Sequence, residues 1–396
     1  MTETPGKQAK APASGLRLLG AFGKSLGGRA TISSIVLVAL GALIAPSTVS
    51  ASAFLSLLPF VAILAVVSIG QHLVIQQRGL DISVAGIMSF AAVIVTKLPS
   101  AGASNNEILG WIALALVSGL VAGAVNGVVI TLLRVPALVT TIGVNAVLFG
   151  VALLVSGGVP SGAPPQLASF AINLTLGVPN TIWIALAAGA VAIFITERTT
   201  IGRRFVAVSV SAPAAHAVAI PVERYRIGTY MAAGLLYAVG GVMLAGYLSV
   251  PNIFAGNFYI LATVAAVVVG GNSVAGGARG SILATMIGAF FLTFLSQLVL
   301  SAGLDRSMQN VVQALIVIGG VGLPMLFARP RARAAAAAAP RAAASATDAV
   351  PIMLGAKPGA VPVLELKGIR KSFGPVDALK NVSFTALPGE IHAVLG

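Results

Sequence analysis

Long apolar runs that carry almost no charge are the feature of this sequence that most restricts its fold. Residues 30–327 contain only fifteen charged residues, whereas about 25% of the residues in a soluble domain are charged. A water-soluble fold of this size cannot cover its surface with so few charges. The sequence therefore predicts an all-α polytopic membrane protein.

A helix needs about 20 apolar residues to cross a bilayer. Ten segments come near this length: 30–46, 53–75, 80–97, 108–133, 137–155, 180–196, 227–247, 258–275, 281–300 and 308–327. Gly79, Asp81 and Ser83 interrupt the start of the third segment, so we expect a broken or half-inserted helix there. The Asp81 or Ser83 side chain is expected to accept from the first free N–H groups of the following helix.

Lysine and arginine are distributed unequally between alternate connections, which predicts the orientation in the membrane. Cations occur in the N-terminal tail and in every second connection: Lys7, Lys10, Arg17, Lys24, Arg29, Arg78, Arg134, Arg198, Arg203, Arg204, Arg224, Arg226 and Arg279. The other connections contain only Lys97 and Arg306 as cations. Ten spans with both termini in the cytoplasm satisfy this pattern. The net charge of +14 thus reflects membrane orientation, and no nucleic-acid partner is expected.

Small residues recur at every fourth position of the fourth segment, at Ala115, Gly119, Gly123 and Gly127. Such a helix face lets a neighbouring helix approach closely. The pattern is compatible with static packing and with the sliding surface of a moving helix.

The polar side chains inside the spans are mainly amides and hydroxyls, each of which is costly in hydrocarbon. We expect Asn126, Asn145, Asn272 and Gln297 to line a translocation path. The alternative for each is a hydrogen bond to a carbonyl group of a neighbouring helix. An interior that is polar but nearly uncharged favours a neutral, hydrogen-bonding solute over an ion or a proton.

The sequence predicts no metal site and no catalytic residue. It contains no cysteine, and its three histidines, His72, His216 and His392, are not at metal-ligand spacing. An intramembrane enzyme would need a metal motif or a Ser/His pair in the spans. A secondary transporter or channel that works without an ATPase, which is the alternative from another class, would need buried carboxylates or a charged pore ring. The spans offer neither pattern, so we expect a transporter that is not itself an enzyme and has no cofactor of its own.

The composition changes abruptly after residue 327. Residues 328–362 are rich in Ala, Pro and Arg, as in a linker. Beyond the linker, residues 363–367 and 381–385 read as strands. The expected organisation is a cytoplasmic basic tail at 1–29, a transmembrane domain at 30–327, the linker at 328–362 and a short β-rich piece at 363–396.

This β-rich piece resembles the start of an ABC-transporter ATPase domain. Lys371-Ser372-Phe373-Gly374 is similar to a K-x-F/Y-G turn, residues 377–384 to D-A-L-x-x-V-S-F, and residues 388–396 to P-G-E-I-x-A-x-L-G. The resemblance implies that Phe373 stacks on adenine and that Gly396 is the first glycine of a phosphate-binding loop.

The lysine, the Mg²⁺-binding hydroxyl and the carboxylate that ATP hydrolysis requires are not present in this piece. We therefore expect a permease–ATPase fusion that is truncated before the phosphate loop, with Phe373 and Gly396 as vestigial nucleotide-binding residues. ATP and Mg²⁺ would bind only on the ATPase domains of the complete transporter. So short a piece cannot form its own core, and we expect it to be disordered.

The spans resemble the permeases of ribose/galactose/xylose-type ABC importers over nearly all of residues 30–327. Residues 79–85 are similar to G-x-D-L-S-V-G, although Ala85 replaces the final glycine. Residues 123–127 are similar to G-x-x-N/T-G, residues 134–141 to R-V-x-A-F/L-I-A-T, and residues 265–277 to A-A-V-V-L-G-G-T-S-L-x-G-G.

The connection at 197–226 resembles the loop with which this family contacts its ATPase. It keeps Gly202, Arg203, Ala214 and Ile220 of the family pattern. It departs from the pattern at three positions, with Ser209 or Val210 in place of a glycine, Ser211 in place of an asparagine and Ala219 in place of a later glycine. We expect residues 212–219 to form a short docking helix. The alternative is a plain solvated connector.

The resemblance implies an importer permease in a bacterial cytoplasmic membrane, for a neutral small solute such as the monosaccharides ribose or xylose. It also implies three partners: a second permease half in a homodimer, ABC ATPase domains that are fused or separate, and a periplasmic or extracellular solute-binding protein. ATP binding and hydrolysis would drive alternating access. Nucleosides, autoinducer-type furanosyl compounds and branched-chain amino acids remain open as solutes.

Overall fold

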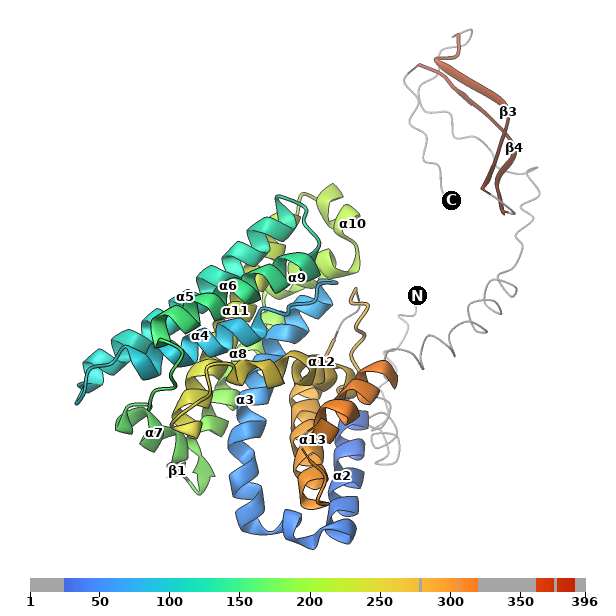
Figure 1. Cartoon of the computed structure of the whole chain (residues 1–396). Coiled ribbons are helices and arrows are strands. Elements are labelled where there is room, and N and C mark those ends of the chain that lie inside the picture. Colours follow the sequence, from blue (N-terminus) through green and yellow to red (C-terminus); the bar gives the residue numbers. More distant parts are fainter. Residues whose placement is uncertain (1–24, 278–279, 306, 320–360, 374–375, 389–396) are drawn as a thin grey trace, which may run out of the picture. The chain divides into compact units, whose positions relative to one another are not determined.

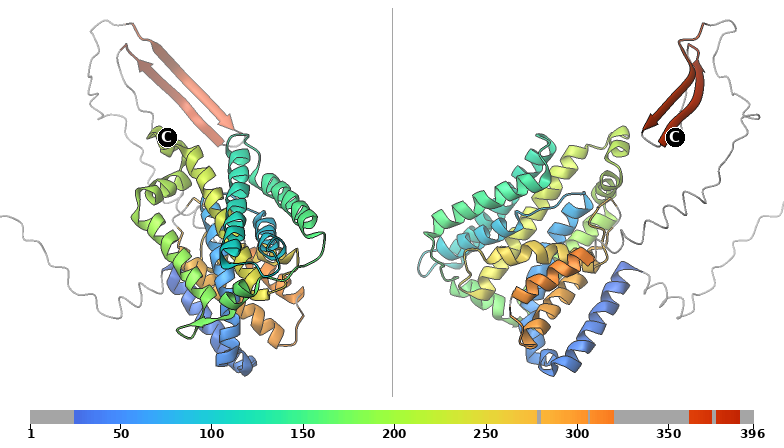
Figure 2. Two further views of the ribbon diagram at one scale, coloured as in Figure 1. Left: turned by 90° about the vertical axis from the view of Figure 1, so that its left-hand side faces the viewer. Right: turned by 45° about the vertical axis from the view of Figure 1, so that its right-hand side comes forward.

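The computed structural model describes residues 25–277, 280–305, 307–319, 361–373 and 376–388. The chain divides into two compact units, Met1–Arg329 and Pro330–Gly396. The described part of the first unit is almost entirely helical, and that of the second contains a β-hairpin (Figures 1 and 2). Gly396 and the predicted linker, apart from residues 361–362, lie outside the described residues.

Seven helices in the described part of the first unit are long and apolar enough to cross a membrane. They are α2 (Leu26–Ile44), α3 (Ala51–Gln76), α5 (Asn105–Thr131), α6 (Ala137–Ser156), α8 (Asn180–Arg198), α11 (Val222–Leu248) and α13 (Ile282–Ser301). Three further apolar segments are shorter: α4 (Val84–Lys97), η2 (Ala255–Phe258) with α12 (Tyr259–Val269), and the helix Ser307–Gly319. Helices thus occupy part or all of each of the ten predicted segments, but only seven reach full length, so the count of ten spans stays a prediction.

Short elements connect the long helices. They are η1 (Pro46–Val49), α7 (Pro165–Ile172), α9 (Thr200–Val210), α10 (Ala212–Ala217), and the strands β1 (Leu174–Thr175) and β2 (Val178–Pro179). The two strands pair antiparallel. Residues 156–179, where α7 and this hairpin lie, carry no charge, and the sequence predicted only a connection there.

Helices α3 and α11 form the centre of the first unit. In the most apolar 18-residue stretch of each helix, 67% of the residues of α3 and 61% of those of α11 are buried, against 17% for α6 and α8. α11 packs against α3, α4 and α5, whereas α2 and α3 flank α13 (Figure 1). Helices that are apolar on every side are buried in protein or face lipid. α6 and α8 therefore present their exposed apolar sides to lipid or to another subunit.

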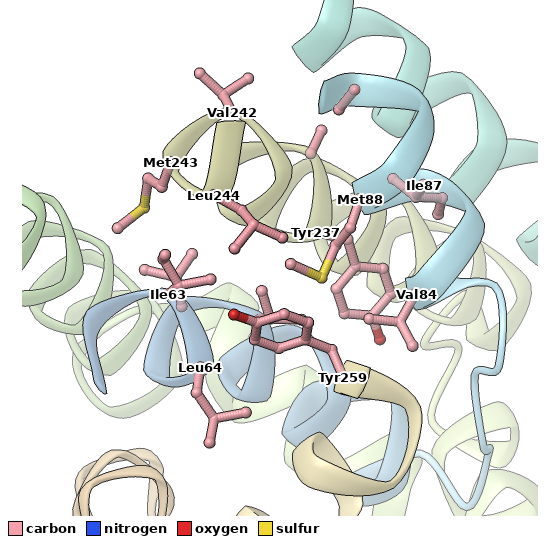
Figure 3. Packing of buried hydrophobic residues seen from close by; sticks show 14 of the residues in the cluster. Ile63, Leu64, Val84, Ile87, Met88, Tyr237, Val242, Met243, Leu244 and Tyr259 are labelled. Carbon is pink, nitrogen blue, oxygen red and sulfur yellow. The ribbon is translucent and has the colours of Figure 1, made fainter. Parts of the chain in front are cut away.

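One part of the main core lies where α3, α4, α11 and α12 meet. Ile63 and Leu64 of α3 lie beside Met88 of α4, Leu244 of α11 and Tyr259 of α12 (Figure 3). All five side chains are buried. This packing fixes the short helices α4 and α12 against the two central helices.

The small-residue face of α5 packs directly on α11. A Cβ added to Gly119 would collide with the carbonyl oxygen of Gly234, and a Cβ added to Gly234 would collide with that of Gly119. A Cβ on Gly127 would lie 2.7 Å from the Cα of Ile227, and one on Gly123 would meet the carbonyl oxygen of Tyr230. The two backbones are thus in contact along this face, which leaves no space for a larger residue.

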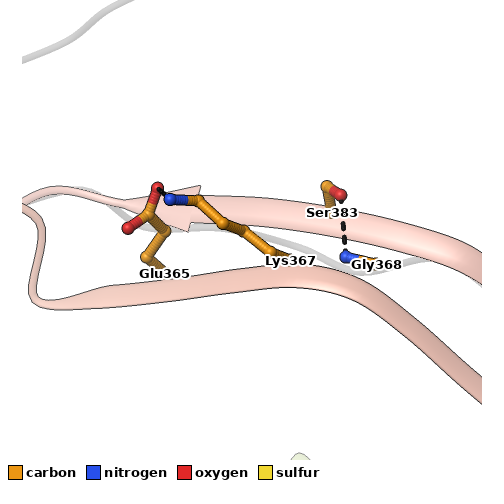
Figure 4. Close-up of polar contacts among 4 residues, drawn as sticks. All are labelled: Glu365, Lys367, Gly368 and Ser383. Atoms are coloured by element: carbon orange, nitrogen blue, oxygen red, sulfur yellow. Dashed lines mark hydrogen bonds and ion pairs between the residues drawn. The ribbon is translucent and has the colours of Figure 1, made fainter.

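The second unit contains one antiparallel hairpin. Its strands are β3 (Leu364–Phe373) and β4 (Val376–Ala386). Glu365 and Lys367 form an ion pair of 2.8 Å, and the Gly368 N–H donates to Ser383 Oγ (Figure 4). The two predicted strands exist and are longer than predicted, so the expectation of disorder is wrong for these residues. Val363 and Val382 remain exposed, as expected for a piece without its own core.

Candidate functional site

The chain breaks between α3 and α4 at a buried polar turn. The Ser83 N–H and the Ser83 hydroxyl both donate to Asp81 Oδ1, over 2.9 and 2.6 Å. Both side chains are almost fully buried. Asp81 thus binds the residue that precedes α4. It does not bind the free N–H groups inside the helix, which corrects the expected capping arrangement.

Asn126 of α5 extends this turn into a three-residue network. Its side-chain amide donates to Ser83 Oγ over 2.7 Å, and Asn126 has no exposed surface. Ser83 therefore accepts from Asn126 while it donates to Asp81. Asp81 Oδ2 and Asn126 Oδ1 have no hydrogen-bond partner among the described residues.

Asn145 of α6 supplies the cap that the sequence led us to expect from Asp81 or Ser83. Its Oδ1 accepts from the Gly86 N–H, in the first turn of α4, over 2.7 Å. Thr141, also on α6, accepts from the Ile82 N–H over 3.2 Å. The start of α4 is thus satisfied by a neighbouring helix, because no residue of its own turn reaches these N–H groups.

Gly79 lies where the chain leaves α3. A Cβ at this position would collide with the hydroxyl oxygen of Tyr230 and approach Val74 Cγ1 to 3.0 Å. A larger residue here would have to displace the Tyr230 side chain of α11.

Asn272 links the end of α12 to the start of α13 by side-chain hydrogen bonds. Its Oδ1 accepts from the Ser281 N–H over 2.7 Å, and its amide donates to Thr285 Oγ1 over 3.0 Å. His72 Nδ1 lies 2.8 Å from the same Thr285 hydroxyl. Asn272 and His72 also line a small cavity of about 190 Å³.

A larger cavity of about 560 Å³ lies between α3, the end of α11, α13 and the helix Ser307–Gly319. Its polar lining consists of hydroxyls and amides, from Ser56, Tyr247, Asn252, Tyr259, Thr293, Ser296, Gln297, Gln309 and Gln313. Among the described residues that line it, none is Asp, Glu, Lys, Arg or His. Its volume is within the range of small-molecule sites.

Gln313 is the polar group in this cavity that most needs a partner. It is 3% exposed, and neither its Nε2 nor its Oε1 has a hydrogen-bond partner among the described residues. Gln309, one turn earlier, donates to the Ser296 carbonyl over 3.2 Å. A buried amide without partners costs about 1–3 kcal/mol, so a ligand that satisfies both ends of Gln313 would recover this energy.

The four predicted path residues therefore occupy different places. Gln297 lines the large cavity and Asn272 the small one. Asn126 and Asn145 hold the start of α4. The role of these four in solute passage stays a prediction. Gln309 and Gln313 were not among them, although two glutamines four residues apart in an apolar helix are a signal that the sequence contains.

The predicted coupling loop contains two short helices, α9 and α10, with a small core of their own. Val208, Ala215 and Val222 are its buried members, and Ile220 packs against them. Gly202 is buried in α9, where a Cβ would collide with the Thr196 carbonyl oxygen. Arg203, next to it, is exposed.

Ser211 has a role that the sequence reading missed. Its hydroxyl accepts from the Ala214 N–H over 3.3 Å and caps α10, which occupies part of the stretch that we expected to be helical. Phe373 is the last residue of β3, and its side chain lies outside the described part of the hairpin. Adenine stacking by Phe373 and a phosphate-loop role for Gly396 stay predictions.

Comparisons with known proteins place this geometry in context. Residues 53–321 match the model of the family described as branched-chain amino acid transport system / permease component. The ribose import permease proteins RbsC of Escherichia coli K12 and Haemophilus influenzae are each 29% identical to the chain, over 73% and 74% of it and 91% of their own length. The autoinducer 2 import system permease protein LsrC of Yersinia pseudotuberculosis is 29% identical over 74% of the chain and 82% of its own length. No solved structure matches the chain.

Proposed function

This chain belongs to the family described as branched-chain amino acid transport system / permease component, and we propose that it is the permease of an ATP-binding-cassette importer for a neutral sugar. It is a multi-pass protein of the inner membrane. The relatives named for ribose and autoinducer 2 import support a sugar-type solute.

The observation that carries the proposal is the composition of the large cavity. Its described lining offers hydroxyl and amide groups without a charged side chain, and neither the donor nor the acceptor of Gln313 has a partner among the described residues. A sugar presents hydroxyls that both donate and accept, so it can satisfy Gln313 at both ends. A branched-chain amino acid would also need an anionic partner for its ammonium group, and none of the described residues that line the cavity is acidic.

The complete transporter in this proposal contains two copies of the permease, with both termini in the cytoplasm. ABC ATPase domains dock on the 197–226 loop, and a solute-binding protein delivers the sugar on the outside. ATP and Mg²⁺ bind on the ATPase domains, and no cofactor is needed in the chain itself. The hairpin at 364–386, whose sequence resembles an ATPase domain, supports a fusion of the permease to an ATPase domain. In this fusion, residues 1–29 form a basic tail before the spans, and residues 328–362 form a linker between the spans and the ATPase domain.

The test is an uptake screen in the native host, with and without the gene for this chain. The labelled solutes are ribose, xylose and galactose, a purine nucleoside, a furanosyl autoinducer and leucine. We expect loss of sugar uptake only, with uptake that stops on ATP depletion and survives a protonophore. Loss of leucine uptake alone would overturn the choice of solute, and uptake that a protonophore abolishes would indicate an ion-coupled transporter.

A further inference from the structure

An apolar groove of about 620 Å³ lies between α8 and α11, and it shares no lining residue with the large cavity that contains Gln313. Most of its lining comes from the second half of α8 and the first half of α11, with α9 across one end. Val191 and Ile195 of α8 and Ile201 of α9 line it and are 58%, 41% and 58% exposed. The groove is therefore open on one side, along a helix pair that is apolar enough to cross the membrane.

Two arginines mark the end of the groove that lies at the 197–226 loop. Arg204 of α9 and Arg224 of α11 both line it, and both are exposed. Neither guanidinium group has a hydrogen-bond or ion-pair partner among the described residues, although Glu197 and Glu223 lie on the same loop. No acidic residue lines the groove in the described part of the chain.

The length of the groove matches one leaflet of a bilayer. On α11 it runs from Arg224 to Leu236, which corresponds to about 18 Å along a helix. Half of the hydrocarbon core of a bilayer measures about 15 Å. An acyl chain can thus lie along the apolar part while a negatively charged headgroup reaches the two arginines.

We propose that this groove binds one phospholipid with an anionic headgroup, whose phosphate lies between Arg204 and Arg224 and whose acyl chain lies between α8 and α11. Arginine suits this role because its planar guanidinium binds phosphate in a bidentate manner. Basic pockets at the membrane surface favour anionic lipid, with about a fivefold gain for each cation. The lipid would fill the space between the spans and the first helix of the loop.

Native mass spectrometry of the purified full-length chain tests the proposal. The delipidated protein is titrated with phosphatidylglycerol, with phosphatidylcholine of the same acyl chains, and with glycerol phosphate alone. We expect phosphatidylglycerol to bind roughly tenfold or more tightly than phosphatidylcholine, and glycerol phosphate not to be retained. Equal binding of the two lipids would overturn the role of the arginines, and retention of glycerol phosphate would indicate an anion site without an acyl chain.

Three variants assign the bound lipid to the groove. Arg204→Gln with Arg224→Gln should remove the preference for the anionic lipid. Arg134→Gln with Arg198→Gln, which removes the same charge from exposed positions that do not line the groove, should leave it unchanged. Gly228→Leu fills the groove without a change of charge, and its Cβ meets no atom within 4 Å, so the variant should fold and lose both lipids. Unchanged lipid binding in folded Gly228→Leu, or equal loss in both arginine pairs, would overturn the proposal.

Discussion

Gly119 and Gly234 lie opposite each other on α5 and α11, so close that a Cβ on either would collide with the carbonyl oxygen of the other. Gly234→Ala is therefore expected to lower the free energy of unfolding by about 1–3 kcal/mol, because the two backbones must separate. Thermal unfolding in detergent measures the effect. Gly110→Ala, at an exposed position of α5 with no atom near the added Cβ, should be neutral or stabilising by up to about 1 kcal/mol. Equal melting of the two variants would contradict contact between the helices.

Ser83 links Asp81 to Asn126, so its loss affects two buried groups. Ser83→Ala should destabilise the protein by about 1–3 kcal/mol, because the Asn126 amide loses its acceptor, whereas Asp81 Oδ1 keeps the bond from the backbone N–H of position 83. The matched control is Ser118→Ala on α5, whose hydroxyl donates only to the Ala115 carbonyl of its own helix. We expect a change of about 0.5 kcal/mol or less for this control. A double-mutant cycle with Asn126→Ala should show coupling, and strictly additive effects would exclude the network.

Asn145 caps a helix to which it does not belong. Asn145→Leu should destabilise the start of α4 by about 0.5–2 kcal/mol, and the Gly86 amide should then exchange its hydrogen faster than in the wild type. Hydrogen-exchange mass spectrometry of peptides that span 82–90 measures this change. Leu154→Ala, at a position of α6 that is 83% exposed, should leave these peptides unchanged. If the amide hydrogens of residues 82–90 exchange at the same rate in Asn145→Leu and Leu154→Ala, Asn145 does not cap α4.

Gln313 offers a way to separate function from stability. Gln313→Leu removes two buried atoms without partners, so the protein should become more stable or stay unchanged. If Gln313 contacts the solute, uptake of the sugar should nevertheless fall by about five- to tenfold, which corresponds to about 1 kcal/mol. Gln166→Leu, which removes an amide outside this cavity, should leave uptake unchanged. Normal uptake in Gln313→Leu would remove the cavity from the solute path.

Gly202 lets α9 fold back against the end of α8. Gly202→Ala should displace α9, because its Cβ would meet the Thr196 carbonyl oxygen, and should reduce ATP-dependent uptake several-fold while the spans stay folded. The control is Gly143→Ala on α6, where the added Cβ meets nothing within 4 Å. Uptake is compared at equal protein abundance in the membrane. Full activity of Gly202→Ala would show that the position of α9 does not matter for coupling.

The positions of the apolar helices in residues 30–327 were predictable, because each of them coincides with a run of apolar residues in the sequence. Each apolar run became a helix, and the polar residues at 79–83 correctly marked the break before α4. Helix lengths were less predictable. The eighth predicted segment extended through residues 270–275, yet α12 ends at Val269, before Gly270 and Gly271, so the helix is shorter than expected.

The partners of buried polar side chains were not predictable from the sequence. Asn126, Asn145 and Asn272 look equivalent along the chain, and each fits a solute path as well as a structural bond. Their hydrogen bonds depend on which helices meet, since Asn145 reaches Gly86 only because α6 lies against α4. Gln313 is distinguished by the absence of such a neighbour among the described residues, which is a property of packing and not of sequence.

The shortness of α4 has a consequence for the synthesis of the protein. Its 14 residues span about 21 Å, which is less than the hydrocarbon core of about 30 Å. Asn126, which binds Ser83 just before α4, and Asn145, which caps its first turn, are both made later than α4 itself. We therefore expect the segment 84–97 to stay at the translocon until α5 and α6 have emerged. A nascent chain stopped before residue 137 should leave this segment open to water-soluble labelling reagents, and one extended beyond Ser156 should protect it.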